Sequence, residues 1–227
     1  ASLGAYFESL WSHPMEPTDQ DRLLCSLLTP ARLLEFLRSY VLFDRKVGKI
    51  VARYQQFFGI RALLARIRQV RPDGGREGGV VWHTTGSGKS FTMVFLTKAL
   101  LLVDALAECR VVVVTDRVDL EGQLSRNFIS GGAFGSAIAS QKDGEKSRAM
   151  TGRDLARRIG SGTERITFTL VHKFNSASKL PECRNDSANL IVLVDEGHRS
   201  HGGETHERMK KALPRAAYIA FTGTPLL

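Results

Sequence analysis

Residues 83–90, His-Thr-Thr-Gly-Ser-Gly-Lys-Ser, combine glycines, a lysine and a hydroxyl at a spacing suited to holding a phosphate chain. The glycines let successive backbone N–H groups turn toward phosphate, and a helix beginning there adds the positive end of its dipole. Lys89 should meet the β- and γ-phosphates, and the Ser90 hydroxyl should hold Mg²⁺. The residues expected to bind ATP are Thr85, Gly86, Ser87, Gly88, Lys89 and Ser90.

This loop departs from the full G-x-x-x-x-G-K-[ST] pattern at one position, because His83 stands where the pattern has glycine. Gly86 and Gly88 are the positions where the backbone must approach a ligand, so the departure is tolerable. A glycine turn that ends in Lys-Ser by chance is the alternative. A strand expected before the loop and a helix expected after it favour phosphate binding.

A second set of chemical groups is the acid pair Asp195-Glu196, which follows the aliphatic run 190–194. Asp195 is suited to Mg²⁺, and Glu196 to orienting and deprotonating an attacking water. An acid pair at a helix start, favoured by the helix dipole, is the alternative. Parallel α/β sheets bind ligands at the carboxyl ends of their strands. We therefore expect the phosphate loop and the acid pair to share one Mg·ATP from neighbouring strand ends.

The elements that must position these groups alternate short aliphatic runs with helical stretches after Pro72. Runs that are apolar on both faces are typical of parallel strands covered by helices on each side, which predicts a doubly wound α/β sheet. We expect helices at 91–107 and 154–159. Strands are expected at 80–83, 110–115, 165–171, 190–195 and 217–222, with a weaker one at 136–140.

The residues before this region have a helical pattern. Thr18 can cap a helix that begins at Asp19, and Thr29-Pro30 is a good start signal for a second helix through about Phe43. A further helical run covers about 49–70. We expect a helical segment over 1–48 and an ATP-binding domain over 49–227.

The net charge of +9, from 32 basic and 23 acidic side chains, favours a polyanionic partner such as nucleic acid. Basic residues spread over a solvated surface are the alternative. No apolar run reaches the roughly 20 residues of a membrane-spanning helix, and no secretory signal is seen. Three widely separated cysteines suit reduced thiols in a cytoplasmic protein, with Cys25 and Cys109 as buried packing residues.

Several segments resemble the superfamily two helicases and translocases. Asp195-Glu-Gly-His198 looks like their DEAD/DEAH-type box, Val112–Arg117 like motif Ia, and Phe221–Pro225 like motif III. The resemblance implies that Thr222, Gly223 and Thr224 couple the nucleotide state to the grip on nucleic acid. Related motors keep an adenine-reading glutamine before the phosphate loop, and we choose Gln55 over Gln56 for this role.

Five segments together resemble the motor (R) subunit of type I restriction endonucleases: 52–57 (Ala-Arg-Tyr-Gln-Gln-Phe), 82–90, 114–117, 171–174 (Val-His-Lys-Phe) and 194–199. The resemblance extends over about residues 33–225. The resemblance implies a RecA-like P-loop fold and ATP hydrolysis that drives double-stranded DNA translocation, beside methyltransferase and specificity subunits. Arg117 and Lys173 are the expected contacts to DNA phosphates. The family's nuclease cluster is not found in the first 48 residues, and the second motor domain is not found in this sequence. We therefore expect this chain alone to bind ATP weakly and to hydrolyse it very slowly, since the second domain would carry the arginine finger.

Other interpretations remain open. Another superfamily two helicase or remodelling ATPase is the main rival, and a nucleotide-gated protein-interaction module is the rival outside enzymes. His198, His201 and His206 could suggest zinc, but no zinc-site spacing is met.

Overall fold

The computed structural model describes residues 18–44, 48–84, 86–116, 118, 125, 146–195 and 203–223. It divides the chain into two compact units, Ala1–Arg38 and Ser39–Leu227. The boundary expected at residue 48 falls inside a hairpin of the second unit. That this unit is the first of two motor domains stays a prediction.

The first unit contains α2 (Asp19–Leu27), and α3 (Pro30–Ser39) begins in it. The Thr18 hydroxyl accepts a hydrogen bond from the Asp21 backbone N–H at 3.2 Å, and the Thr18 N–H donates to the Asp21 carboxylate at 2.9 Å. This reciprocal capping box confirms the expected helix start. Cys25 on α2 is exposed, so the expectation that it packs in a core is wrong.

A two-stranded antiparallel hairpin opens the second unit, with β1 at Val41–Asp44 and β2 at Gly48–Val51. The helical expectation for these residues is wrong. Gly48 adopts a positive φ of 88°, which helices do not contain. The hairpin is anchored because the buried Tyr40 packs edge-on against Phe57 at 4.8 Å, and the Lys98 ammonium donates to the Val41 carbonyl at 2.9 Å.

The centre of the second unit is a sheet of five parallel strands in the order β3-β7-β6-β4-β5. Each strand lies within a residue of its expected bounds, except that 136–140 falls outside the described residues. The strands are β3 (Gly79–Trp82), β4 (Arg110–Thr115), β5 (Ile166–Leu170), β6 (Leu190–Asp195) and β7 (Ala217–Thr222).

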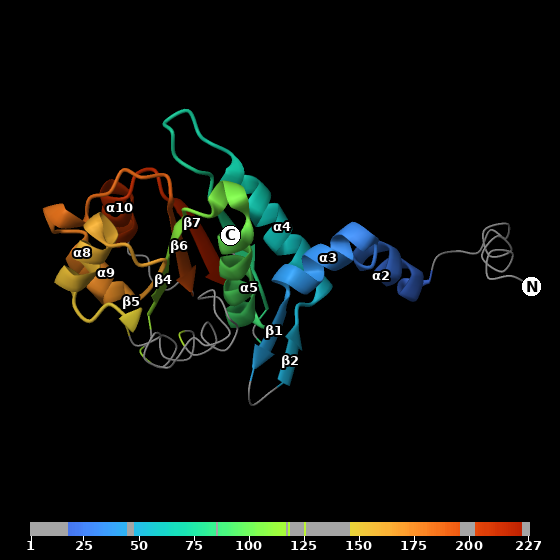
Figure 1. The fold of residues 1–227 in the computed structure, drawn as a ribbon. Helices are drawn as coiled ribbons and strands as arrows, with labels where there is room; N and C mark the ends of the chain where they lie inside the picture. Colours follow the sequence, from blue (N-terminus) through green and yellow to red (C-terminus); the bar gives the residue numbers. More distant parts are fainter. Residues whose placement is uncertain are drawn as a thin grey trace, which may run out of the picture. The chain divides into compact units, whose positions relative to one another are not determined.

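Helices cover both faces of this sheet, as Figure 1 shows. Val112 and Val114 pack in a buried cluster with side chains of α8, α9 and α10, while Val111 and Val113 point to the other face and are also buried. That other face carries α4 and α5. This layering confirms the doubly wound α/β fold. The helices are α4 (Tyr54–Arg68), α5 (Lys89–Leu102), α8 (Gly152–Ser161), α9 (Val171–Ala177) and α10 (Gly203–Ala212), with short 3₁₀ turns at Asp104–Leu106 and Pro181–Cys183.

Because the strands are parallel, β3, β7 and β6 end at one edge of the sheet. In the part of the chain that the structure describes, no helix is both long and apolar enough to cross a membrane.

Candidate nucleotide-binding site

The phosphate loop connects the end of β3 to the start of α5, and Lys89 and Ser90 are the first two residues of that helix. Gly86 and Gly88 have φ angles of 79° and 88°, a left-handed conformation that side chains rarely tolerate. A Cβ at Gly88 would lie 3.1 Å from the Gln56 amide nitrogen. These two glycines are therefore required by the backbone. Thr85 lies outside the described residues.

The phosphate loop and the acidic strand end meet in space. The Lys89 ammonium lies 3.4 Å from the Asp195 carboxylate, and the two side chains are 17% and 4% exposed. Their strands are not adjacent, however, because β7 lies between β3 and β6. The expectation of neighbouring strand ends is corrected to strand ends one strand apart, which the lysine side chain spans.

These groups fit a magnesium-bound triphosphate. Lys89 supplies positive charge, the start of α5 supplies backbone N–H groups, and Ser90 with Asp195 supplies the hard oxygen ligands that Mg²⁺ prefers. When bound, Mg²⁺ would neutralise charge on the phosphate oxygens. Glu196, the expected base for the attacking water, lies outside the described residues.

The His83 side chain contacts another residue of the phosphate loop. Its Nδ1 lies 2.9 Å from the Ser87 hydroxyl, which in turn lies 2.6 Å from the Thr84 carbonyl. Burial, and then the positive charge of Lys89, lower the pKa of His83. The imidazole is therefore neutral at pH 7, which avoids a second positive charge beside the Lys89 ammonium.

Of the two neighbouring glutamines, Gln56 and not Gln55 faces the loop. Gln55 is exposed, whereas Gln56 is 5% exposed and its amide donates to the Gly88 carbonyl at 3.2 Å and the Thr92 hydroxyl at 2.9 Å. Its Oε1 accepts from the Arg53 backbone N–H at 2.8 Å. Adenine recognition by Gln55 stays a prediction; the structure places Gln56, rather than Gln55, against the phosphate loop.

The segment expected to couple nucleotide and nucleic acid begins where β7 ends. Thr222 is 1% exposed, and its carbonyl accepts a hydrogen bond from the His83 backbone N–H at 2.9 Å. Gly223 follows directly, and its carbonyl accepts from the Trp82 indole at 3.3 Å. Thr224 lies outside the described residues. Sequence reasoning did not identify Trp82 as part of this arrangement.

The two expected DNA contacts have different outcomes. Arg117 lies outside the described residues. Lys173 lies on α9, and its ammonium donates to the Ala149 carbonyl at 2.8 Å, so it helps hold the segment before α8. Its contact with DNA stays a prediction.

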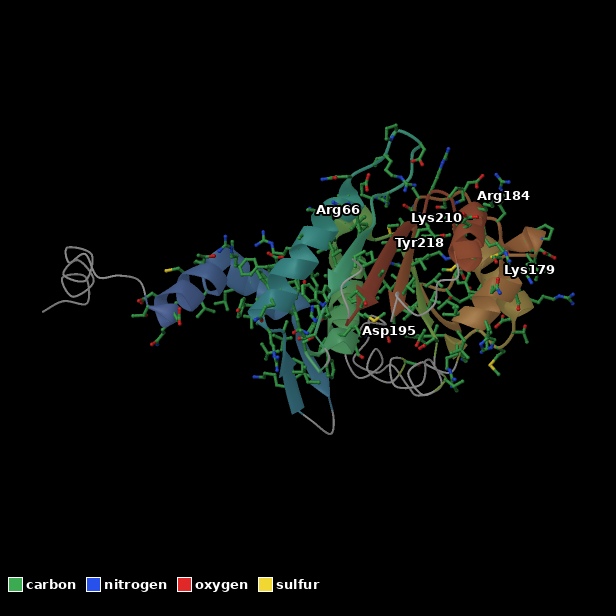
Figure 2. All side chains as sticks on the ribbon, turned by 180° about the vertical axis from the view of Figure 1, so that it is seen from behind. Arg66, Lys179, Arg184, Asp195, Lys210 and Tyr218 are labelled. Atoms are coloured by element: carbon green, nitrogen blue, oxygen red, sulfur yellow. The ribbon has the colours of Figure 1, made fainter. Side chains whose placement is uncertain are left out.

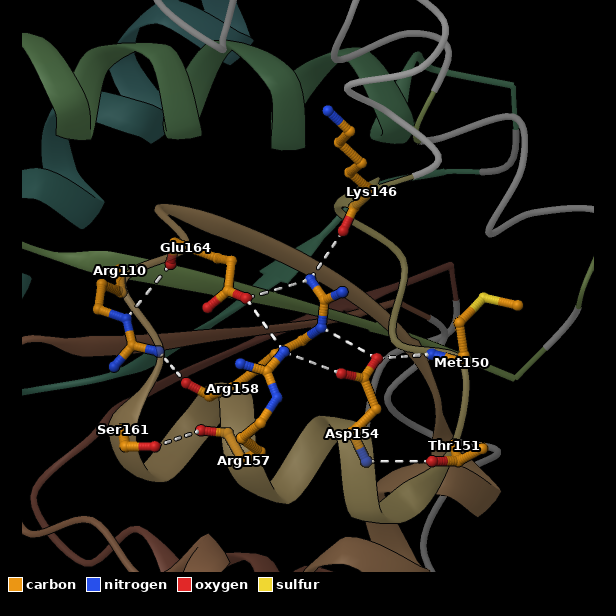
Figure 3. A network of polar contacts seen from close by, with 9 residues as sticks. All are labelled: Arg110, Lys146, Met150, Thr151, Asp154, Arg157, Arg158, Ser161 and Glu164. Atoms are coloured by element: carbon orange, nitrogen blue, oxygen red, sulfur yellow. Dashed lines mark hydrogen bonds and ion pairs between the residues drawn. The ribbon is translucent and has the colours of Figure 1, made fainter.

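The same segment is held from its other side by a charged network on α8 (Figure 3). Arg158 donates to the Lys146 carbonyl at 2.8 Å and to the Asp154 carboxylate at 3.0 Å, while Asp154 accepts from the Met150 backbone N–H at 3.0 Å. Arg110, at the start of β4, donates to the backbone carbonyls of Glu164 and Arg158. Residues 146–150 are therefore fixed by α8 and α9 together.

Several basic side chains lie away from the candidate site. Figure 2 shows Asp195 at one edge of the sheet and Arg66, Lys210 and Arg184 toward the other. Arg66 and Lys210 lie in the last turns of α4 and α10, where positive charge complements the helix dipole. Some of the basic residues that make the chain positively charged therefore lie where they stabilise helix ends.

The zinc alternative gains no support from the described residues, which contain no group of three or more His, Cys, Asp or Glu able to hold a metal ion. His198 and His201 lie outside these residues, as does the side chain of His206.

The fold and the site define a RecA-like, ATP-binding α/β domain of the helicase superfamily two type. A family model described as SWI2/SNF2 ATPase matches residues 55–227, and the chain belongs to this family.

Two curated relatives are a type I restriction enzyme HindI endonuclease subunit of Haemophilus influenzae and a putative type I restriction enzyme MjaIXP endonuclease subunit of Methanocaldococcus jannaschii. They are 37% and 34% identical over 90% and 97% of this chain. The chain spans 21% of the length of each.

A solved structure of a Sulfolobus solfataricus SWI2/SNF2 ATPase core in complex with dsDNA has a TM-score of 0.53 at 12% identity, covering 84% of this chain and 34% of that one. This likeness supports the fold.

Proposed function

We propose that this chain is the ATP-binding half of a DNA translocase motor in a type I restriction complex. In this role ATP hydrolysis drives double-stranded DNA past the complex, and the motor works with methyltransferase and specificity subunits in the cytoplasm. Lys89, Asp195 and Glu196 are the catalytic residues, with Mg²⁺ held by Ser90 and Asp195. The family and the two restriction relatives support the general class.

The observation that carries the proposal is the contact between Lys89 and Asp195 at 3.4 Å. A buried ion pair contributes little net stability, because removing two charges from water costs nearly as much free energy as their attraction returns. When Mg·ATP binds, phosphate would become the stronger partner of Lys89, and Mg²⁺ would become the stronger partner of Asp195. The pair therefore holds both side chains in place for Mg·ATP.

The second candidate function is strand separation, which is another activity of superfamily two. Translocation and unwinding differ in outcome, because a translocase displaces a third strand from a DNA triplex without separating the duplex. Both assays on the full-length subunit, assembled with its partner subunits, distinguish them. Triplex displacement without strand separation supports the proposal, and strand separation supports the alternative.

Nucleotide binding is tested on this chain with a fluorescent ATP analogue and Mg²⁺. Lys89→Ala should reduce affinity below detection, since the ammonium group and its charge are removed from the phosphates. Lys98→Ala, on the same helix but bonded to the hairpin, is the matched control and should bind normally. Unchanged affinity in a folded Lys89→Ala variant would defeat the assignment.

A further inference from the structure

His83 is bonded to two functional segments at once. Its backbone N–H donates to the Thr222 carbonyl at 2.9 Å, which continues the pairing of β3 with β7 one residue past Trp82. Its ring nitrogen Nδ1 lies 2.9 Å from the Ser87 hydroxyl in the phosphate loop. A glycine, which the common pattern has at this position, could make the first bond but not the second.

The direction of the ring bond follows from the geometry. The Ser87 hydroxyl has a single hydrogen, and it lies 2.6 Å from the Thr84 carbonyl, which can only accept. Ser87 therefore donates to Thr84 and accepts from His83, so Nδ1 carries the hydrogen. The result is a chain in which His83 donates to Ser87 and Ser87 donates to Thr84. The Ser87 backbone N–H donates to the same carbonyl at 3.1 Å, which closes the turn.

Trp82 makes the neighbouring connection. Its indole N–H donates to the Gly223 carbonyl at 3.3 Å, although 61% of the residue is exposed. Two consecutive carbonyls, those of Thr222 and Gly223, are thus held by two consecutive residues at the end of β3. The indole is also a spectroscopic reporter at this position, because the chain contains one other tryptophan, Trp11.

We propose that His83 is a positioning residue that sets the shape of the phosphate loop through Ser87, and that Trp82 and His83 together tether this loop to the Thr222–Gly223 segment. Movement of the loop when a triphosphate binds is then passed directly to the end of β7. This inference deepens the proposed function and rests on it.

The experiment is a double-mutant cycle in nucleotide binding by this chain, measured with the fluorescent ATP analogue. His83→Ala and Ser87→Ala should each weaken affinity roughly three- to tenfold, as expected for loss of one hydrogen bond. Because both residues act through one chain of bonds, the double variant should bind about as weakly as either single variant. His83→Asn keeps an N–H donor near the same place and should restore most of the affinity.

The tether is read from Trp82 fluorescence in a Trp11→Phe background. A non-hydrolysable ATP analogue at saturation should shift the emission of Trp82, and this shift should be lost in His83→Ala even when the site is saturated. Losses that add in the double variant, or an emission that does not respond to bound nucleotide, would overturn the inference. Lys89→Ala distinguishes failure of the proposed function from failure of this inference. If Lys89→Ala binds nucleotide normally, the proposed function fails. If only His83→Ala binds normally, the positioning role alone is refuted.

Discussion

Arg157 and Arg158 are consecutive residues on α8 that contact the same two carboxylates, Asp154 and Glu164, yet only one of them should matter for stability. The Arg158 side chain is 11% exposed and that of Arg157 is 57% exposed. Replacing each arginine by methionine keeps an apolar stem of similar length. The two variants therefore compare one type of ion pair in a buried and an exposed setting.

The expected effect of Arg158→Met follows from its bonds. It loses hydrogen bonds to the Asp154 carboxylate at 3.0 Å and the Lys146 carbonyl at 2.8 Å. Hydrogen bonds of charged groups contribute ~1.5–3 kcal/mol each. Because Asp154 is 22% exposed and keeps the Met150 N–H, we take the low end for both bonds and expect a total loss of ~3 kcal/mol. In a domain of this size that lowers Tm by roughly 6–12 °C.

Urea unfolding followed by circular dichroism measures the loss directly. Arg157→Met should leave the unfolding free energy nearly unchanged, because solvent screens exposed pairs and long side chains lose entropy when they are held. Hydrogen exchange adds a local measurement, since Arg158→Met should release the Ala149 and Phe168 amides that pair residues 146–150 with β5. Equal destabilisation by the two variants would show that burial does not set the strength of this network.

Three further predictions concern the glutamines and the thiols. Gln56→Ala should weaken ATP binding in titrations with the fluorescent analogue and lower the free energy of unfolding in urea. Gln55→Ala should change neither quantity. A thiol reagent at pH 8 should modify one cysteine of the folded chain, Cys25, and three after unfolding, because Cys109 and Cys183 are buried. Burial raises the pKa of Cys183 to about 11, so the folded state keeps a proton that the unfolded chain loses above pH ~9. The free energy of unfolding should therefore fall by up to ~1.4 kcal/mol per pH unit between pH ~9 and 11, less steeply in Cys183→Ala.

The parallel strands could be predicted closely from sequence, and the hairpin could not. Runs such as Val111–Val114 are buried on both faces and consist of β-branched residues, which favour strands. The hairpin strands do not show the alternation typical of a strand: Val41 and Leu42 are consecutive buried residues in β1, and in β2 only Ile50 is partly buried. The hairpin also exposes large apolar side chains. Phe43, for example, is 70% exposed. Gly48, at the turn, was the available signal for a hairpin.

The burial of Gln56 rather than Gln55 could also have been predicted from sequence. The buried residues of α4 include Gln56, Ile60, Leu63 and Ile67, which recur at helical spacing, so Gln56 lies on the apolar stripe and Gln55 does not. The order of the strands in the sheet could not be predicted from sequence. Nothing in the local sequence shows that β7, the last strand along the chain, is inserted between β3 and β6.

That insertion places the end of β7 between the two parts of the candidate site, which supports the coupling role expected for Thr222 and Gly223. The phosphate loop follows β3 and Asp195 ends β6, so the end of β7 is the backbone between them at this edge. If the Lys89 and Asp195 side chains move apart, the backbone at the end of β7 lies directly beside that movement. The His83 N–H holds this backbone from one side through Thr222, and the pairing of Asp195 with Phe221 holds it from the other. We therefore expect this segment, fixed on both sides by the two parts of the candidate site, to respond to bound nucleotide.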